Sequence, residues 1–491
     1  MAKRFCRDHY ALYCERYQVT MKILFATPPV SRTFLYGELR EAGSAAPALG
    51  LLMLAAVARG QGHEVAVLDG VAMQLDAGSF AARLTAFSPA LLALSATTFT
   101  VAAAAAAAAE FKQKHPAGLT VIGGPHVSAA AEETMARFPA FDLAVIGEGE
   151  AALADLLQAL DAGAPLTSVA GLVVRVGEGL TATAPRTPIA DLDALPAPAW
   201  DLLEGFPQRY APAPFKVRQL PAASLVSSRG CPNRCLFCDR SVFGDRCRFH
   251  SAESVVALVR TLRQRFGVRE VCFEDDTFVT HRPRLKAICE RLIELDLGVT
   301  WNCLARVNQV TAEPLDLMRR AGCWQVSYGI ESGSQAVLDL IGKQATLAQI
   351  RQAVAMTRDA GLRAKGFFIL GHPGETPGTL RETIDFALSL PLNDISVSLM
   401  TPFPGTELHR RATEFGTLIP DWDRMNLLTP AFVPHGLTAE ALLAAQRELL
   451  RRFYLRPRVF ADYAGRVARQ PSLALPLLRG GMAVLKTVRH D

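Results

Sequence analysis

Two series of apolar runs alternate with helical patterns along this chain, and this alternation restricts the fold more than any other feature. The first series consists of KILFAT, EVAVLD, LLALSA, LTVIGG and LAVIGE, and its gaps hold helical patterns such as Pro47 to Arg59 and Thr100 to Lys114. Uninterrupted apolar strands separated by helices are typical of a parallel sheet covered on both faces. The series predicts a doubly wound α/β domain over residues 21–162, whose ligands bind beyond the carboxyl ends of the strands.

The second series lies in residues 223–415 and consists of SLVSSRG, EVCFEDD, VTWNCLAR, WQVSYGIE, AKGFFILG and DISVSLM. Six strands followed by helices predict a partial (β/α)6 barrel, in which the chemistry belongs at the carboxyl ends of the strands. The helical patterns include Ala252 to Arg265, Arg284 to Leu295, Leu347 to Ala360 and Thr376 to Leu390.

The remaining segments flank these two domains. Residues 163–222 begin with a possible hairpin and hold eight prolines between Pro185 and Pro221, which neither a helix nor a central strand tolerates. This segment is predicted to be a hairpin and a linker, and residues 416–491 are predicted to be helical. Residues 1–20 form an N-terminal extension that lacks the features of a secretory signal, so we expect a cytoplasmic protein.

Charge and hydropathy restrict the partners. The net charge is +5, and residues 451–491 alone hold nine Lys or Arg against two Asp or Glu. No basic patch interleaved with aromatic residues occurs in the body, so nucleic-acid binding is not expected. The run PSLALPLLRGGMAVLKTV is apolar and flanked by bases, which fits either peripheral contact with a membrane surface or a terminal helix docked on the barrel.

A cysteine triplet follows the first strand of the predicted barrel. In SSRGCPNRCLFCDR, the residues Cys231, Cys235 and Cys238 have Cys-x3-Cys-x2-Cys spacing. Three thiolates on one loop can hold three corners of a 4Fe-4S cluster and leave one iron open to a small ligand. The alternative is a structural zinc ion with Cys247 or His250 as its fourth ligand, but the paired Cys-x2-Cys knuckles of such sites are missing.

The triplet, with Phe237 before its last cysteine, resembles the radical S-adenosylmethionine (SAM) superfamily. Five further segments look like motifs of that family in their usual order: FEDDTF, ARVN, GIESGS, GFFILGHPGET and TPFPGTEL. The resemblance implies that the amino and carboxylate groups of SAM chelate the open iron of a 4Fe-4S cluster, while the ends of the strands hold the rest of SAM.

The same resemblance implies SAM contacts for individual residues. Carboxylates after the second barrel strand can accept hydrogen bonds from the SAM ammonium group, and Arg306 can pair with its carboxylate. For Asp275 and Arg306 the alternative is an ordinary ion pair in the mouth of the barrel. Cys272, Cys289, Cys303 and Cys323 lie in apolar patterns and are assigned no chemistry. The implied SAM contacts are Phe237, Glu274, Asp275, Asp276, Arg306, Glu331, Ser332 and Gly371.

The ends of the strands in the first domain carry ATPP, LSATT, IGGPHVS and IGEGE. Glycine and small hydroxyl residues let a backbone lie against a large planar or phosphorylated ligand, which also fits a nucleotide. Ahead of a radical SAM barrel, this set resembles the cobalamin-binding domain of the cobalamin-dependent radical SAM class. The Asp-x-His-x-x-Gly motif is missing, so the resemblance implies a cobalt without a histidine ligand and makes His126 a loop residue near the corrin. The pocket candidates are Ser95, Thr97, Gly123, Gly124, Pro125, His126 and Glu148.

The resemblance implies that a reduced cluster cleaves SAM to a 5'-deoxyadenosyl radical, which abstracts hydrogen from an unactivated carbon. C-methylation from methylcobalamin is the expected outcome, with an electron donor such as flavodoxin or ferredoxin. One alternative keeps the cofactors but performs ring formation, rearrangement or oxidation on a lipid or tetrapyrrole. Another is a cobalamin-binding sensor without catalysis, against which the intact cysteine triplet argues. The substrate is expected to be a small molecule.

Overall fold

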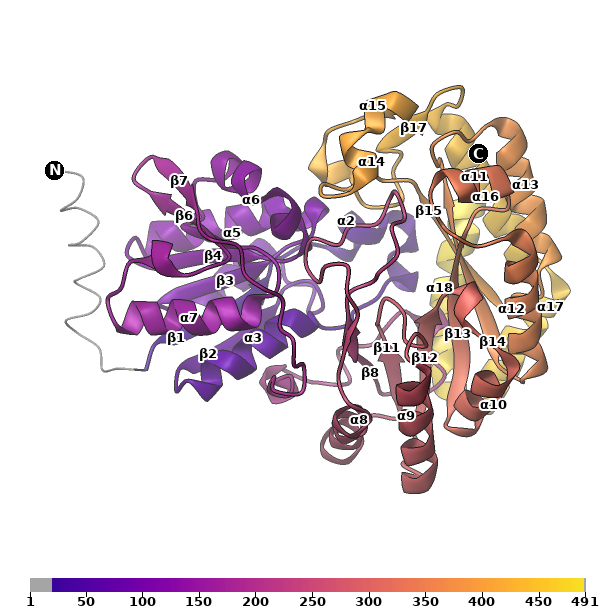
Figure 1. The fold of residues 1–491 in the computed structure, drawn as a ribbon, viewed down its shortest axis with the longest axis horizontal. Helices are drawn as coiled ribbons and strands as arrows, with labels where there is room; N and C mark the ends of the chain where they lie inside the picture. The colour runs from indigo at the N-terminus through magenta and orange to yellow at the C-terminus, as the bar shows by residue number, and fades with distance from the viewer. Residues whose placement is uncertain (1–19, 490–491) are drawn as a thin grey trace. The chain divides into compact units, whose positions relative to one another are not determined.

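The computed structural model describes residues 20–489, which form two compact units (Figure 1). Of the described residues, the first unit comprises 20–31, 47–206 and 239–244. The second unit comprises residues 32–46, 207–238 and 245–489. The segment 32–46 therefore leaves the first unit directly after its first strand, although the sequence pattern places it in the first domain.

A seven-stranded sheet in the order β2-β1-β3-β4-β5-β6-β7 forms the centre of the first unit. The first five strands are parallel, and their 2-1-3-4-5 order is that of a doubly wound fold, which confirms the predicted class. The strands are β1 (Lys22–Thr27), β2 (Glu64–Asp69), β3 (Leu91–Ser95), β4 (Leu119–Gly123), β5 (Leu143–Val145), β6 (Leu172–Val176) and β7 (Gly179–Ala182), and the helices are α3 (Leu49–Gly60), α4 (Ala77–Phe87), α5 (Val101–Lys114), α6 (Pro125–Arg137) and α7 (Gly149–Asp161).

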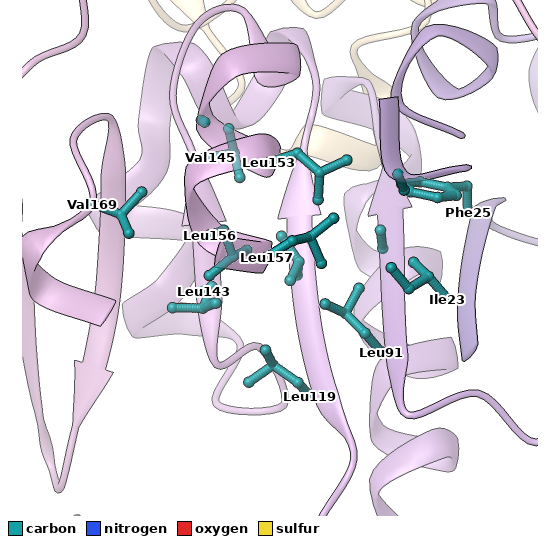
Figure 2. Close-up of a cluster of buried hydrophobic side chains, with 14 of the residues drawn as sticks. Ile23, Phe25, Leu91, Leu119, Leu143, Val145, Leu153, Leu156, Leu157 and Val169 are labelled. Carbon is teal, nitrogen blue, oxygen red and sulfur yellow. The ribbon is translucent and has the colours of Figure 1, made fainter. Parts of the chain in front are cut away.

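Buried aliphatic side chains hold α3 and α7 against one face of this sheet. Leu153, Leu156 and Leu157 of α7 pack over strand residues such as Leu91 and Leu143 (Figure 2). Burial of a Leu or Ile side chain contributes about 1.5–3 kcal/mol, so a continuous aliphatic layer of this kind stabilises the sheet that carries the loops of the first unit.

The hairpin after residue 163 belongs to the first sheet. Strand β6 pairs antiparallel with β5, and β7 pairs antiparallel with β6, so the sheet ends in two antiparallel strands. The segment 163–222 therefore divides, because its hairpin continues the sheet whereas its proline-rich part runs on into the second unit.

A six-stranded parallel sheet in the order β15-β14-β13-β12-β11-β8 forms the centre of the second unit. Neighbouring strands follow the order of the chain, with helices α10, α12 and α13 on the outer side in Figure 1, and this confirms the predicted partial barrel. The strands are β8 (Ala222–Leu225), β11 (Glu270–Phe273), β12 (Thr300–Ala305), β13 (Cys323–Glu331), β14 (Arg363–Leu370) and β15 (Asp394–Leu399), and the helices are α8 (Ala252–Phe266), α9 (Arg282–Leu295), α10 (Ala312–Arg320), α11 (Gln335–Leu340), α12 (Leu347–Asp359) and α13 (Pro377–Ser389).

Local signals in the sequence fix the helices of the barrel. Helix α8 begins after Ser251, whose hydroxyl accepts a hydrogen bond from the Ser254 amide, and it ends at Gly267 with φ +68°. Helix α12 begins with a capping box between Thr346 and Gln349. The shorter elements of the second unit are α2 (Arg32–Tyr36), β9 (Ser228–Arg229), β10 (Arg248–Phe249), α14 (Glu407–Arg410), α15 (Ala412–Phe415), β16 (Gly416–Leu418) and β17 (Phe432–Pro434).

Three C-terminal helices complete the second unit: α16 (Ala439–Tyr454), α17 (Pro457–Arg469) and α18 (Ala474–Arg489). Leu473 and Leu477 pack in one buried cluster with Val217, Ala222 of β8 and Cys272 of β11. The predicted helical region is thus docked on the barrel. Within residues 20–489, no helix combines the length and apolar character needed to cross a bilayer.

Candidate active site

The cysteine loop lies between two short strands that tie its ends together. Strand β9 pairs antiparallel with β10, so that Arg229 faces Arg248 and Ser228 faces Phe249. The middle of the loop is fixed at Leu236, whose amide donates to the Ile341 carbonyl at 2.9 Å and whose carbonyl accepts from the Leu408 amide at 2.9 Å. Backbone hydrogen bonds from distant segments therefore hold the loop in place.

Two side chains direct N–H groups at the cysteine sulfurs. A guanidinium nitrogen of Arg306, at the end of β12, lies 3.6 Å from Cys235 Sγ. The Asn233 amide lies 3.2 Å from Cys231 Sγ. Cys231 and Cys235 are half-buried and Cys238 is exposed. A cationic donor beside a sulfur stabilises a thiolate, which is the form that binds iron.

The three cysteines fit the ligand set of an iron cluster with one open iron. Within the part of the chain that the structure describes, no three His, Cys, Asp or Glu side chains converge as ligands of one ion would. In a cuboidal cluster each thiolate binds a different iron, so the three sulfurs do not have to converge. Cys247 donates instead to the Gly230 carbonyl at 3.2 Å.

Asp275 anchors the base of the cysteine loop. Its carboxylate accepts hydrogen bonds from the Ser227 amide at 2.5 Å, the Ser227 hydroxyl at 2.6 Å and the Ser228 amide at 2.9 Å. Arg284 donates to the carbonyl and the hydroxyl of the same Ser227, each at 2.7 Å. Burial raises the pKa of Asp275 to about 6. These bonds are all within the chain, and a contact between Asp275 and SAM stays a prediction.

The neighbours of Asp275 occupy different environments. Glu274 accepts from Lys216 Nζ at 2.5 Å and from the Ser224 hydroxyl at 3.2 Å. Asp276 is exposed. Of the three acidic residues after β11, Asp276 is therefore the one most accessible to a ligand.

The end of β13 carries a buried ion pair that the sequence did not reveal. Lys343 Nζ lies 2.6 Å from Glu331 Oε1, and both side chains are less than one-tenth exposed. Arg306 also donates to the Lys343 carbonyl, so the ends of β12 and β13 are joined near Cys235. Ser332 is buried and its hydroxyl lies 3.0 Å from that of Thr383 on α13, which fixes the turn after β13.

Glu375, which lies in the loop after β14, fixes the conformation of that loop by hydrogen bonds. Glu375 Oε2 accepts from the Gly371 amide at 2.5 Å and from the His372 amide at 3.0 Å, and Gly371 adopts φ +91°, a conformation that favours glycine. Burial raises the pKa of Glu375 to about 7 and lowers the pKa of His372 to about 3. The His372 ring packs on Phe237 with ring centroids 5.6 Å apart. This loop therefore supports the cysteine loop directly.

His126 of the first unit is enclosed by threonines. Its Nδ1 lies 3.2 Å from the Thr98 hydroxyl and its Nε2 lies 3.1 Å from the Thr134 hydroxyl, and the side chain is 2% exposed. Burial and the charge of Arg137 lower its pKa to about 4. The sequence placed His126 in a loop near a ligand, whereas it lies in the first turn of α6 with both ring nitrogens engaged by the protein.

The other pocket candidates divide into exposed and structural residues. Thr97 and Pro125 are exposed beyond the ends of β3 and β4, and Ser95 and Gly123 are half-buried there. Gly124 lies so close to the end of β3 that a Cβ atom would approach the Ala96 carbonyl oxygen to 2.7 Å. Glu148 is buried and accepts from the Ile189 amide at 2.8 Å, so it anchors the chain after the hairpin. Contact of these residues with a corrin stays a prediction.

The burial of His126 makes the stability of the protein sensitive to acid. Above pH 6.5 the imidazole is neutral in both folded and unfolded chains; between pH 6.5 and 4 the unfolded chain binds a proton that the folded chain excludes. The free energy of unfolding should therefore fall by up to about 3 kcal/mol over this range. Urea titrations at pH 7 and pH 4.5 measure the change in the free energy of unfolding between the two pH values. This change should be smaller in His126→Gln than in the wild type. In His435→Gln, at an exposed histidine, it should equal that of the wild type.

Comparison with known proteins finds two families along the chain. A B12 binding domain model matches residues 39–157, and a model of the radical SAM superfamily matches residues 225–387. An uncharacterized methyltransferase of Pyrococcus horikoshii is 34% identical over 89% of this chain and 94% of its own length. The anaerobic magnesium-protoporphyrin IX monomethyl ester cyclase of Rubrivivax gelatinosus is 28% identical over 90% of this chain and 79% of its own length.

A solved structure shares the fold. It is that of the radical SAM methyltransferase TsrM of Kitasatospora setae with cobalamin and a [4Fe-4S] cluster bound, with a TM-score of 0.65, 19% identity, and coverage of 81% of this chain and 75% of that one. The chain belongs to the radical SAM superfamily and carries a B12 binding domain ahead of its radical SAM domain. The resemblance seen in the motifs is therefore confirmed, and the protein is a radical SAM enzyme.

Proposed function

We propose that this protein is a cobalamin-dependent radical SAM methyltransferase that transfers a methyl group to an unactivated carbon of a small molecule. One observation carries the proposal: three cysteines lie on a backbone-anchored loop at the carboxyl ends of the half-barrel strands, with Arg306 directed at Cys235. The identity to a relative named as a methyltransferase over nearly its whole length supports this outcome.

In this proposal Cys231, Cys235 and Cys238 hold the 4Fe-4S cluster, and the ends of β11 to β14 hold SAM. When bound, the cluster supplies the electron that cleaves SAM, and cobalamin supplies the methyl group. Arg306 would place its positive charge beside the Cys235 ligand of the cluster, the Lys343 to Glu331 pair fixes the end of β13, and Glu375 shapes the loop against which the adenine of SAM would pack. The side chains of the protein bind and orient the cofactors and the substrate, and they exclude water from the site.

In this proposal His126 does not ligate the cobalt of cobalamin. Both ring nitrogens of His126 face threonine hydroxyls inside the unit. We expect the electron paramagnetic resonance (EPR) spectrum of bound Co(II)-cobalamin to lack nitrogen coupling from protein histidine, both in the wild type and in His126→Gln. Nitrogen coupling that disappears in His126→Gln would contradict this assignment.

The test of methyl transfer does not require the substrate. Anaerobically reconstituted protein is supplied with reduced cobalamin, a chemical reductant and SAM carrying a deuterated methyl group. Formation of deuterated methylcobalamin together with 5'-deoxyadenosine supports the methyltransferase. Formation of 5'-deoxyadenosine without labelled methylcobalamin would instead favour the second candidate.

The second candidate is an enzyme with the same cofactors that forms rings, rearranges or oxidises a lipid or tetrapyrrole. The 28% identity to a magnesium-protoporphyrin ester cyclase over 90% of this chain supports this second outcome. In both cases an electron donor such as flavodoxin or ferredoxin would reduce the cluster. A tetrapyrrole or lipid acceptor should raise 5'-deoxyadenosine formation above the rate without substrate.

A further inference from the structure

Helix α18 docks on the barrel with one face and presents apolar side chains on the other. Its buried face includes Leu477 and Gly480, where a Cβ atom would meet the Phe215 ring at 3.1 Å. On the opposite face, Leu475 is 55% exposed, Leu478 60% and Met482 47%. Residues at these spacings fall on one side of an α-helix, so the three side chains form a single apolar stripe.

Helix α17 has a similar exposed face. Phe460 is 76% exposed, and Leu455, which precedes the helix, is 60% exposed. The helix positions around Phe460 on its outer side are filled by exposed alanines at 461, 464 and 468. The inner side carries Val459 and Arg466, which are buried. Half of the ten exposed large hydrophobic residues in the described chain thus lie between residues 455 and 482.

The charges on these helices have one sign. The exposed residues include Arg458 and Arg469 on α17, and Arg479 and Lys486 on α18. From residue 455 to the end of the described chain, the one acidic residue is Asp462, and it forms an ion pair with Arg363 of β14. The exposed faces of α17 and α18, as far as the structure describes them, therefore offer cations and apolar side chains and no carboxylate that would repel an anion.

We propose that this C-terminal surface docks on an anionic membrane. The surface consists of the apolar residues Leu455, Phe460, Leu475, Leu478 and Met482 and the basic residues Arg458, Arg469, Arg479 and Lys486. Apolar side chains that enter the headgroup region, next to bases that attract anionic lipids, are the features of peripheral membrane helices.

The inference is independent of the proposed chemistry. It rests on the exposure and charge of α17 and α18, and none of its residues lies near the cysteine loop in sequence. Loss of membrane binding should therefore leave the iron content and 5'-deoxyadenosine formation unchanged, and loss of the cluster should leave membrane binding unchanged.

Flotation of the full-length reconstituted protein with lipid vesicles tests the proposal. Vesicles of phosphatidylcholine with 30% phosphatidylglycerol should bind at least about tenfold more protein than phosphatidylcholine alone, and 0.5 M salt should reduce this binding because the bases are screened. Phe460→Ser and the double variant Leu478→Ser with Met482→Ser should each reduce binding about tenfold, because each removes apolar burial. Leu340→Ser, at an exposed leucine elsewhere on the barrel, is the matched control.

Three results would overturn the proposal. The first is that the protein binds neutral and anionic vesicles equally, or binds neither kind. The second is unchanged binding by both serine variants. The third is a dimer in light scattering that the serine variants dissociate, because the apolar stripe would then be covered by a second copy of the chain.

Discussion

Replacing Cys235 with alanine should reduce 5'-deoxyadenosine formation to the level of a protein-free blank. The Cys235 thiol lies 3.6 Å from a guanidinium nitrogen of Arg306, and the next residue, Leu236, anchors the loop. Loss of the thiol would remove one proposed iron ligand and leave the cation without its sulfur partner. Iron content should fall well below the roughly four atoms per chain of an intact cluster. Iron analysis and chromatography of reconstituted protein measure both effects.

Cys247→Ser is the matched control for this variant. Cys247 lies on the same loop, but its sulfur donates to the Gly230 carbonyl, and a serine hydroxyl can donate to the same oxygen. Full iron content in Cys247→Ser alongside loss in Cys235→Ala supports the cluster. If the two variants lose iron equally, Cys247 belongs to the metal site and the assignment of three ligands is wrong.

Replacing Asp275 with alanine should destabilise the second unit and lower its cluster occupancy. The change leaves three buried donors from Ser227 and Ser228 without an acceptor, at a cost of about 3 kcal/mol or more. Ser228 is the first residue of β9 and Ser227 precedes it, so the base of the cysteine loop should lose its position. Thermal unfolding of the apoprotein and the iron content after reconstitution measure the two effects.

Asp275→Asn separates positioning from charge. Its amide oxygen can still accept from the two backbone amides, so cluster occupancy should recover toward the wild-type value. Asp316→Ala, which removes exposed ion pairs on α10, should change stability by at most about 0.5 kcal/mol. Cluster occupancy in Asp275→Ala equal to that of the wild type would show that the loop does not depend on this carboxylate.

The sequence predicted those elements whose signals are local. Strand β1 coincides with the run KILFAT, and α8 begins at the expected Ala252 because Ser251 caps it. Apolar runs of five or six residues leave few alternatives to a buried parallel strand, and the order of the runs then fixes a half-barrel. The motifs likewise identified the cysteine loop, since its spacing is itself local.

Contacts between residues far apart in the chain were not predictable. Lys343 forms an ion pair with Glu331, from which α11 and a turn separate it in the sequence, and no residue pattern predicts that pair. The hydrogen bond from the Ile189 amide to the Glu148 carboxylate likewise joins residues 41 positions apart, and no local signal in the sequence predicts it. Polar residues at the ends of strands serve either ligands or loops, and only the position of their partners distinguishes the two.

EPR spectroscopy of the reduced protein tests the central claim most directly. The claim is that three cysteines bind a 4Fe-4S cluster and leave one iron open to SAM. Dithionite-reduced, anaerobically reconstituted protein should give the signal of a reduced 4Fe-4S cluster, and addition of SAM should change its shape because the open iron gains new ligands. A signal that SAM leaves unaltered, or protein that never assembles a cluster, would contradict the account.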